Sequence, residues 1–411
     1  DPGTGTDPGT GTDPGTGTGT GTDPVVSYVG GIWGAGESIT SSTMATSSQT
    51  VISSPKLHVT DGGNLFANWL TESEPDPATL EFTQRDITVM RAVPDVLGEY
   101  VWSDPGSTLY QPVGYVTSAT DTRFIVNAAT GDGVAIWNDN GSSKTSEFMG
   151  MMGHFMGNAT LPEGHNPQIL VDSAGEVYLV MQTHMMGGFG LSVYKRTAAD
   201  TWSSTPVQLH RMDMTNAISM PNHFLITSID GEDNLRAVWL EEQAGFYCLQ
   251  AATYNGGTDT WGDITTIHAD NMMLNKLASG IASGTPGSSA LQLVLHQQDG
   301  MMHSLFALDY DATTSTWGMA VQLDEQTATT SIIAAPSFAT NTAGNIFVAW
   351  LEVDSAMEAI NASGMMNTLK YRQYMPGSGW NAVDIIAHSS TSADAMALSI
   401  ALSAAGDATA V

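Results

Sequence analysis

The chain has 411 residues, with 42 acidic and 12 basic side chains and a formal net charge of −30. This charge excludes nucleic acid and anionic membrane surfaces as partners, because both are bound through clustered lysine and arginine. The single cysteine, Cys248, excludes an internal disulfide framework. It stands in an apolar stretch, 246–249, which favours a buried thiol on a strand. No stretch approaches the roughly 18 apolar residues of a transmembrane helix.

Residues 1–24 are built from Asp-Pro-Gly-Thr-Gly-Thr repeats. Such sequence cannot bury a core, so we expect a flexible, disordered tether followed by a folded domain over residues 25–411. The tether resembles the spacer behind the lipidated cysteine of bacterial surface lipoproteins, although that cysteine does not occur here. The resemblance implies a processed lipoprotein or secreted protein. We expect it at the outer-membrane surface or outside the cell, with the periplasm as the alternative.

The remainder of the chain is β sequence with an internal repeat. The repeating unit is a short strand, a turn rich in Gly, Asp and Asn, and a second strand that ends in a bulky residue. Its copies occupy residues 56–69, 124–137, 168–181, 224–239, 277–295, 337–350 and, incompletely, 397–411. Self-similarity at this period is typical of the blades of a β-propeller.

A second landmark is a tight turn that ends in tryptophan. Trp202, Trp261, Trp317 and Trp380 stand at these turns, 59, 56 and 63 residues apart. The spacing predicts that the first landmark supplies strands one and two of each blade and that the Trp turn joins strands three and four. The Trp turns should then lie on the rim opposite the loops between strands two and three.

Counting the copies predicts an all-β fold, a seven-bladed β-propeller of four-stranded blades. The segment 26–33 is similar to the strands that flank Trp202, while the last copy stops after its second strand. We therefore expect the N-terminal and C-terminal strands to pair and close the ring.

The turns of the first landmark resemble the Asp-box turns of sialidase-type propellers. The resemblance is one of fold, because no turn spells the full Ser-x-Asp-x-Gly-x-x-Trp pattern and the arginine set of sialidases is not found. We also find no carboxylate pair whose geometry the sequence can support, and no Cys-His motif of a blue-copper site. The sequence therefore predicts a protein that is not an enzyme, with a glycan-acting enzyme as the least favoured alternative.

Methionine and histidine recur in short clusters, and the chain holds 22 Met. Thioether and imidazole without thiolate suit Cu(I) better than Zn(II) or Ca(II), so the clusters predict a copper cofactor. The candidate metal ligands are Met149, Met151, Met152, His154, Met156, His184, Met185, Met186, His210, Met212, Met214, His268, Met272, Met273, Met301, Met302, His303, Met365 and Met366.

In a four-stranded blade, the loops that follow the second and fourth strands open on the same rim. This arrangement predicts that nearly all these clusters share one rim. Three clusters fall between strands two and three, and two fall between strand four and the next blade. The densest run, 148–156, is interpreted as following strand two of the second blade. It resembles the methionine-rich segments of bacterial copper-handling proteins, which implies Cu(I) uptake, buffering or detoxification. We expect sites that combine this run with His184 or Met185, and less often His210 with Met212.

Another interpretation is that the methionines form an apolar rim that docks a protein partner or a second copy of the chain. His58 and His296 fit structural histidines in or beside strands. His165 and His388 lie close to loops that follow fourth strands and are candidates for secondary ligands.

Overall fold

A computed structural model describes the chain over residues 49–51, 56–60, 64–73, 85–94, 100–102, 107–109, 123–127, 130–139, 142–149, 154–160, 165–185, 188–198, 201–203, 205–209, 225–243, 246–267, 272–284, 291–300, 302–311, 314, 316–324, 330–332, 336–354, 367–389, 399–403 and 405–410. Contacts divide the chain into two units, residues 1–36 and 37–411. The predicted tether, residues 1–24, and the expected closing segment, 26–33, both lie outside the described residues. The boundary at residues 24 and 25 stays a prediction.

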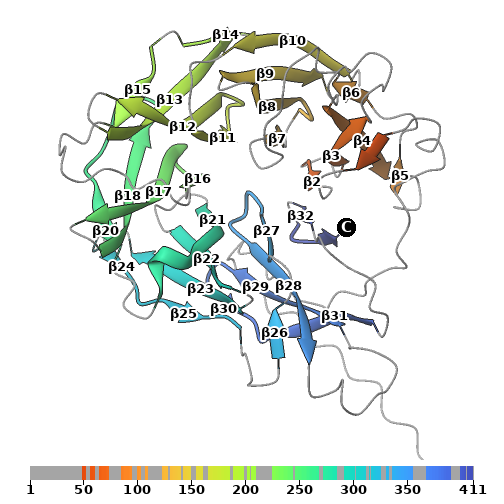
Figure 1. The fold of residues 1–411 in the computed structure, drawn as a ribbon, viewed down its shortest axis with the longest axis vertical. Coiled ribbons are helices and arrows are strands. Elements are labelled where there is room, and N and C mark those ends of the chain that lie inside the picture. Colours follow the sequence, from red (N-terminus) through yellow and green to blue (C-terminus); the bar gives the residue numbers. More distant parts are fainter. Residues whose placement is uncertain are drawn as a thin grey trace, which may run out of the picture. The chain divides into compact units, whose positions relative to one another are not determined.

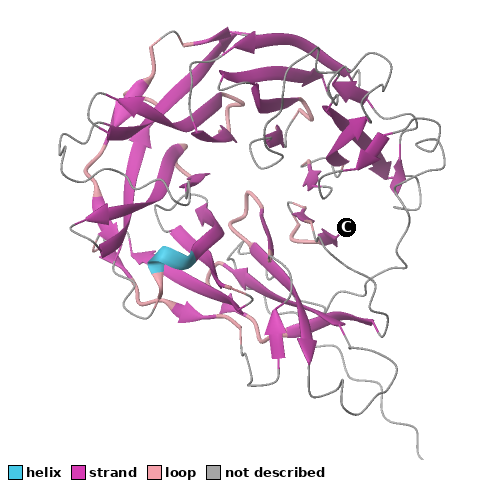
Figure 2. Ribbon diagram, viewed as in Figure 1, coloured by secondary structure: helices cyan, strands magenta, loops and turns pink. Residues whose placement is uncertain are grey.

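The second unit is a β-propeller made of antiparallel sheets that follow one another along the chain (Figure 1). Among the described residues, strands dominate and η3 (Leu274–Lys276) is the helical element (Figure 2). The strands form because apolar residues alternate along them, as in Leu291, Leu293 and Leu295, which are all buried.

The first three blades hold six, four and five strands. Blade one comprises β1 (Gln49–Val51), β2 (Lys56–Val59), β3 (Leu65–Ser73), β4 (Arg85–Pro94), β5 (Tyr100–Trp102) and β6 (Ser107–Leu109). Blade two comprises β7 (Arg123–Val126), β8 (Gly133–Asp139), β9 (Ser142–Met149) and β10 (His154–Thr160). Blade three comprises β11 (His165–Val171), β12 (Val177–Met185), β13 (Gly188–Ala198), β14 (Thr201–Trp202) and β15 (Val207–Leu209).

The next three blades hold five, five and six strands. Blade four comprises β16 (Leu225–Ile229), β17 (Asn234–Gln243), β18 (Phe246–Asn255), β19 (Thr260–Trp261) and β20 (Thr265–Ile267). Blade five comprises β21 (Leu277–Gly284), β22 (Leu291–Asp299), β23 (Met302–Asp311), β24 (Thr316–Trp317) and β25 (Val321–Gln322). Blade six comprises β26 (Thr330–Ile332), β27 (Ser337–Thr340), β28 (Ile346–Asp354), β29 (Asn367–Met375), β30 (Gly379–Trp380) and β31 (Asp384–Ser389).

The prediction of seven four-stranded blades is wrong. The described part of the chain forms six blades of four to six strands, and the last repeat gives only a two-stranded sheet, β32 (Ile400–Leu402) with β33 (Ala408–Ala410). This sheet packs between the inner strands of blades six and one, since β32 contacts β27 and β2. Ser399 Oγ accepts a hydrogen bond of 2.9 Å from the Leu57 backbone N–H. The strand count was wrong because several blades split their inner or outer position into two short strands.

The Trp turns lie where the sequence placed them. β14, β19, β24 and β30 each pair with the third strand of their blade, so each tryptophan begins the outer part of its sheet. We call the rim that carries these turns the Trp-turn rim. It also carries the turns between first and second strands. The loops that follow second and fourth strands open on the opposite rim.

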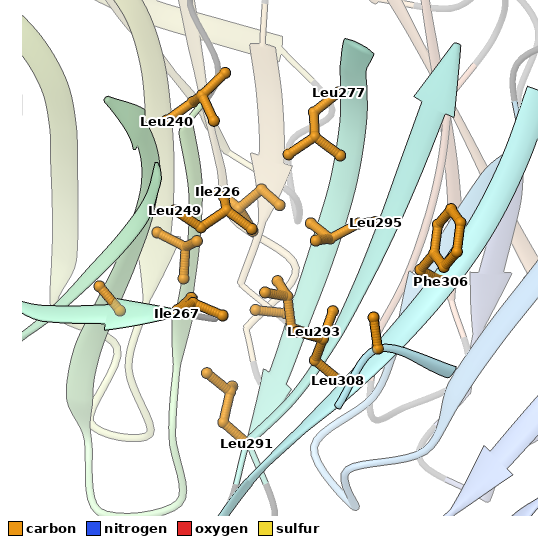
Figure 3. Close-up of a cluster of buried hydrophobic side chains, with 14 residues drawn as sticks. Ile226, Leu240, Leu249, Ile267, Leu277, Leu291, Leu293, Leu295, Phe306 and Leu308 are labelled. Atoms are coloured by element: carbon orange, nitrogen blue, oxygen red, sulfur yellow. The ribbon is translucent and has the colours of Figure 1, made fainter. Parts of the chain in front are cut away.

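The core lies in the seams between blades. At the seam of blades four and five, Ile226, Leu249 and Ile267 face Leu293 and Leu308 (Figure 3). Each buried side chain of this size contributes about 1.5–3 kcal/mol of transfer free energy. Cys248 lies on β18 as expected, but it is half-buried rather than fully buried.

Candidate binding rim of blades four and five

The predicted metal ligands divide between described and undescribed residues. Those outside the described residues are Met151, Met152, Met186, His210, Met212, Met214, His268, Met301, Met365 and Met366. Those inside are Met149, His154, Met156, His184, Met185, Met272, Met273, Met302 and His303.

Five of the six clusters stand in the sequence between the pairs of strands where they were expected. The clusters at His184 and Met302 connect second to third strands, in the hairpins β12–β13 and β22–β23. Met365 and Met366 stand in the sequence between β28 and β29, which occupy the same positions in blade six. The clusters that begin at His210 and His268 stand between a fourth strand and the next blade. All five connections belong to the rim opposite the Trp turns.

The densest run does not share that rim. Met149 ends β9, the third strand of its blade, and pairs with His154, which begins the fourth strand, β10. The two ends of the run, Met149 and His154, therefore lie at the position of a Trp turn, on the Trp-turn rim. The expected combination of this run with His184 or Met185 joins hairpins of opposite rims, which speaks against it.

Two of the predicted clusters do converge, over the seam of blades four and five. The Met273 backbone N–H donates a 2.8 Å hydrogen bond to Gln297 Oε1 of β22. Met302 is paired in register with Asp299, which forms a 2.9 Å ion pair with Lys276 of η3. The helix η3 contacts β18 and β22, so it carries the preceding Met272 and Met273 onto both blades.

Apolar side chains gather at this place, and we call the group Tyr247, Met272, Met273, Leu274 and Met302 the rim patch. Tyr247, Met272 and Leu274 pack partly buried against the core of the seam. Met273 and Met302 are each 56 % exposed, so the patch presents two thioethers to solvent. Phe246, which is 75 % exposed, alternates with Tyr247 along β18 and points to the other face of the strand. Sequence reasoning missed Phe246 and Tyr247, although the preceding Ala244-Gly245 turn places them at a loop.

A pair of histidines lies in the same blade, on the other face of the sheet. His296 Nε2 and His303 Nδ1 are 2.8 Å apart, with the rings stacked, and His296 Nδ1 lies 3.0 Å from Ser279 Oγ. Burial, with the neighbouring His303, lowers the pKa of His296 to about 4, and burial also lowers the pKa of His303. Both imidazoles are therefore neutral near pH 7. Adjacent strand residues point to opposite faces, so His303 is directed away from the Met302 side.

The expectation that His296 is a structural histidine agrees with these contacts. Its partnership with His303 was missed, but the short hairpin at Asp299-Gly300 is a signal for it, because that turn brings the two strands face to face. His58 is also held by a neighbour, since its Nε2 lies 3.1 Å from Asn68 Oδ1. Among the described His, Cys, Asp and Glu residues, no group of three is placed to hold a metal.

No family and no curated protein matches this chain. Solved structures do resemble it. A protein from Lactobacillus plantarum matches with 12% identity and a TM-score of 0.42, over 74% of this chain and 78% of that one. The leech intramolecular trans-sialidase matches with 10% identity and a TM-score of 0.40, over 92% and 67%. The α-L-arabinanase of Penicillium chrysogenum matches with 10% identity and a TM-score of 0.39, over 60% and 74%.

These comparisons bear on three expectations. The chain is a propeller, as the fold-level resemblance to sialidase-type propellers implies, and nothing here supports the resemblance to copper-handling proteins. Against the expectation that the chain is not an enzyme, most of the similar structures with a named activity are enzymes. At these identities the likeness concerns the fold and assigns no activity. Within the described residues, no helix has the length and apolarity to cross a membrane.

Proposed function

We propose that the chain binds Cu(I) through the thioethers of the rim patch. The observation that carries the proposal is the convergence of Met273 and Met302, both half-exposed, from two loops distant in the sequence. Thioethers are soft, neutral ligands that select Cu(I) and need no thiolate. Met272, whose neighbour Leu274 fixes the helix onto the core, supplies a third sulfur at the same seam. Such a surface serves copper uptake, buffering or detoxification outside the cytoplasm.

The histidine pair is a poorer place for the ion. With metal–nitrogen bonds of about 2.0–2.1 Å, two tetrahedral ligands stand roughly 3.3 Å apart. His296 Nε2 and His303 Nδ1 are only 2.8 Å apart and already bonded to each other. Coordination by both would require the stacked rings to separate inside the core. We therefore assign the copper to sulfur and leave the histidines a structural role.

A second candidate function is docking of a protein partner on the same patch. The observation that favours it is the apolar character of the patch, where the half-exposed Met273 and Met302 stand beside the partly buried Tyr247 and Leu274, which offer no soft metal ligand. Methionine is common at adaptable binding surfaces. A net charge of −30 opposes contact with a second copy and favours a basic, amphipathic segment of another protein.

The two functions differ in whether they require sulfur. Exchange of methionine for leucine keeps the apolar volume and removes the thioether. The variant Met273→Leu/Met302→Leu should therefore weaken Cu(I) binding at least tenfold, measured by competition with a chromophoric Cu(I) chelator under anaerobic, reducing conditions. The control is Met181→Leu, because Met181 is fully buried in blade three and should leave the affinity unchanged.

Docking gives the opposite pattern. Binding of a synthetic Leu/Lys amphipathic helix should survive the double leucine variant and should be lost in Met273→Ser/Met302→Ser. Unchanged Cu(I) affinity in the double leucine variant would overturn the copper proposal. Unchanged binding of the helix to the double serine variant would overturn docking.

A further inference from the structure

A cavity of about 120 Å³ lies at the other end of the seam between blades four and five, on the Trp-turn rim. Blade four contributes Arg236, Thr253 and Thr265, together with Asp263. Blade five contributes Leu291, Tyr310 and Trp317. Val238 and Ala251, both buried in the seam, add apolar lining. An apolar hollow with a few convergent polar groups is the usual form of a small-molecule site.

At two other seams a Trp-turn indole donates a hydrogen bond to the preceding blade, and this seam lacks that bond. Trp202 Nε1–H donates across a seam to Thr145 Oγ1 at 3.1 Å, and Trp261 Nε1–H donates across the next seam to the Val207 carbonyl oxygen at 3.5 Å. Trp317 packs in the same way on its third-strand tyrosine, with the Trp317 and Tyr310 ring centroids 5.1 Å apart. Its Nε1 is buried and, like that of Trp380, has no acceptor among the described residues. A buried donor without a partner costs about 1–3 kcal/mol.

The cavity lies on the side where Trp317 would be expected to find its acceptor. Trp202 and Trp261 each find theirs in the blade before their own. For Trp317 the preceding blade is blade four, and the cavity lies between Trp317 and the blade-four residues Thr253, Asp263 and Thr265. A molecule in the cavity that offers an oxygen to Trp317 Nε1 would complete the pattern of the other two seams.

The charges around the cavity select the kind of molecule. Arg236 Nε donates a 3.0 Å hydrogen bond to Asp230 Oδ2, and its guanidinium lies over the Tyr310 ring at 5.3 Å. The Arg236–Asp230 pair is therefore neutral overall, with both side chains largely buried. This neutral pair offers no net charge to attract an ion, while the exposed Asp263 and the net charge of −30 disfavour an anion.

We propose that this cavity binds one edge of a neutral sugar ring. A sugar ring has an apolar face for Trp317 and Tyr310, hydroxyl oxygens that accept from Trp317 Nε1–H and Arg236, and hydroxyl hydrogens that donate to Asp263. The volume equals that of about four waters, at ~30 Å³ each, which admits the edge of a single ring and not a longer chain. The site stands on the rim opposite the rim patch and is independent of the copper proposal.

The test compares two tryptophans that differ in their hydrogen bond. Saturation-transfer NMR with galactose, glucose, mannose and arabinose should detect binding of at least one sugar to the full chain. Trp317→Phe keeps an aromatic ring on Tyr310 and removes the N–H, so we expect affinity for that sugar to fall at least fivefold. Trp261→Phe is the matched control, because the N–H of Trp261 is already used by Val207, and it should bind as the wild type does.

A second variant protects the test against misfolding. Asp263 is exposed, so Asp263→Ala should leave the fold intact and still weaken sugar binding. Methyl glycosides separate two sources of the ligand. If a methyl glycoside binds as tightly as the free sugar, the ligand is the terminal unit of a glycan; if the methyl glycoside does not bind, the ligand is a free sugar. Two results would overturn the proposal. One is that no sugar binds, so that Trp317 Nε1–H is satisfied by water only; the other is equal binding by wild type, Trp317→Phe and Asp263→Ala.

Discussion

At the scale of single residues, His58 shows how burial links this fold to pH. Burial, together with the charge of Lys56, lowers the pKa of His58 from 6.5 to about 4, against the opposing effect of the hydrogen bond to Asn68. Between pH 6.5 and 4 the unfolded chain therefore binds more protons at this site than the folded chain. The stability that neutral His58 provides is complete above pH 6.5 and is lost as the pH falls towards 4.

This linkage gives a prediction for His58→Gln, which keeps a donor for Asn68 and removes the titration. A shift of this size corresponds to at most about 3 kcal/mol between pH 7 and 4. The unfolding free energy of the wild type should therefore fall more steeply on acidification than that of the variant. Urea unfolding at pH 7.0, 6.0, 5.0 and 4.5 measures both slopes. Parallel slopes would show that His58 is protonated in the folded chain and would contradict the prediction.

At the scale of elements, the hydrogen bonds that cross the seams fix one blade to the next. Thr145 is 2 % exposed, and its Oγ1 accepts the Trp202 Nε1–H of the neighbouring blade. Thr145→Val keeps the shape and leaves that indole N–H without an acceptor, so we expect a loss of about 1–3 kcal/mol. The control is Thr227→Val, since Thr227 Oγ1 is buried without a partner among the described residues. Denaturant unfolding should show no loss for Thr227→Val, and equal losses for both variants would contradict the assignment.

The elements also show how far the sequence could predict the fold. Repeats with apolar alternation and a Trp turn were placed correctly, because each blade of that kind buries the same positions. Blade two departs from the pattern. Its third strand, β9, reads as polar sequence because Thr145 and Ser146 fill buried positions that are apolar elsewhere, at 2 % and 1 % exposure. With that strand unrecognised, the methionine run at 149–156 was assigned to the wrong rim.

The sequence also predicted only part of the candidate site. The positions of their loops brought Met273 and Met302 to one rim, and the structure places both there. The position of a loop in its blade does not say which face of the strand a side chain occupies. It could therefore not separate Met302 from His303, which lie on opposite sides of β23. The partly buried Tyr247 and the cavity at Trp317 depend on how two blades pack together, which is information that no single repeat carries.

At the scale of the whole molecule, charge is the dominant feature. The 12 basic residues face 42 acidic ones, and several of the cations are committed to seams between blades. Arg196 pairs with Glu147 of the preceding blade at 3.1 Å, and Lys195 pairs with Asp259 of the following blade at 3.1 Å. Arg372 Nη1–H donates to the Leu323 carbonyl oxygen of blade five at 2.8 Å. The surface therefore keeps a large excess of carboxylates that repel one another.

This imbalance predicts that salt stabilises the fold. Screening weakens both the repulsion and the seam ion pairs, but partly exposed pairs contribute only about 0–1 kcal/mol each, so relief of the repulsion should dominate. We expect the melting temperature to rise as NaCl increases from 20 mM to 0.5 M. The rise should then level off, because the Debye length has already shrunk from about 10 Å at 0.1 M to only a few ångströms. Thermal unfolding followed by circular dichroism measures this curve, and a melting temperature that falls with salt would show that the seam ion pairs outweigh the repulsion.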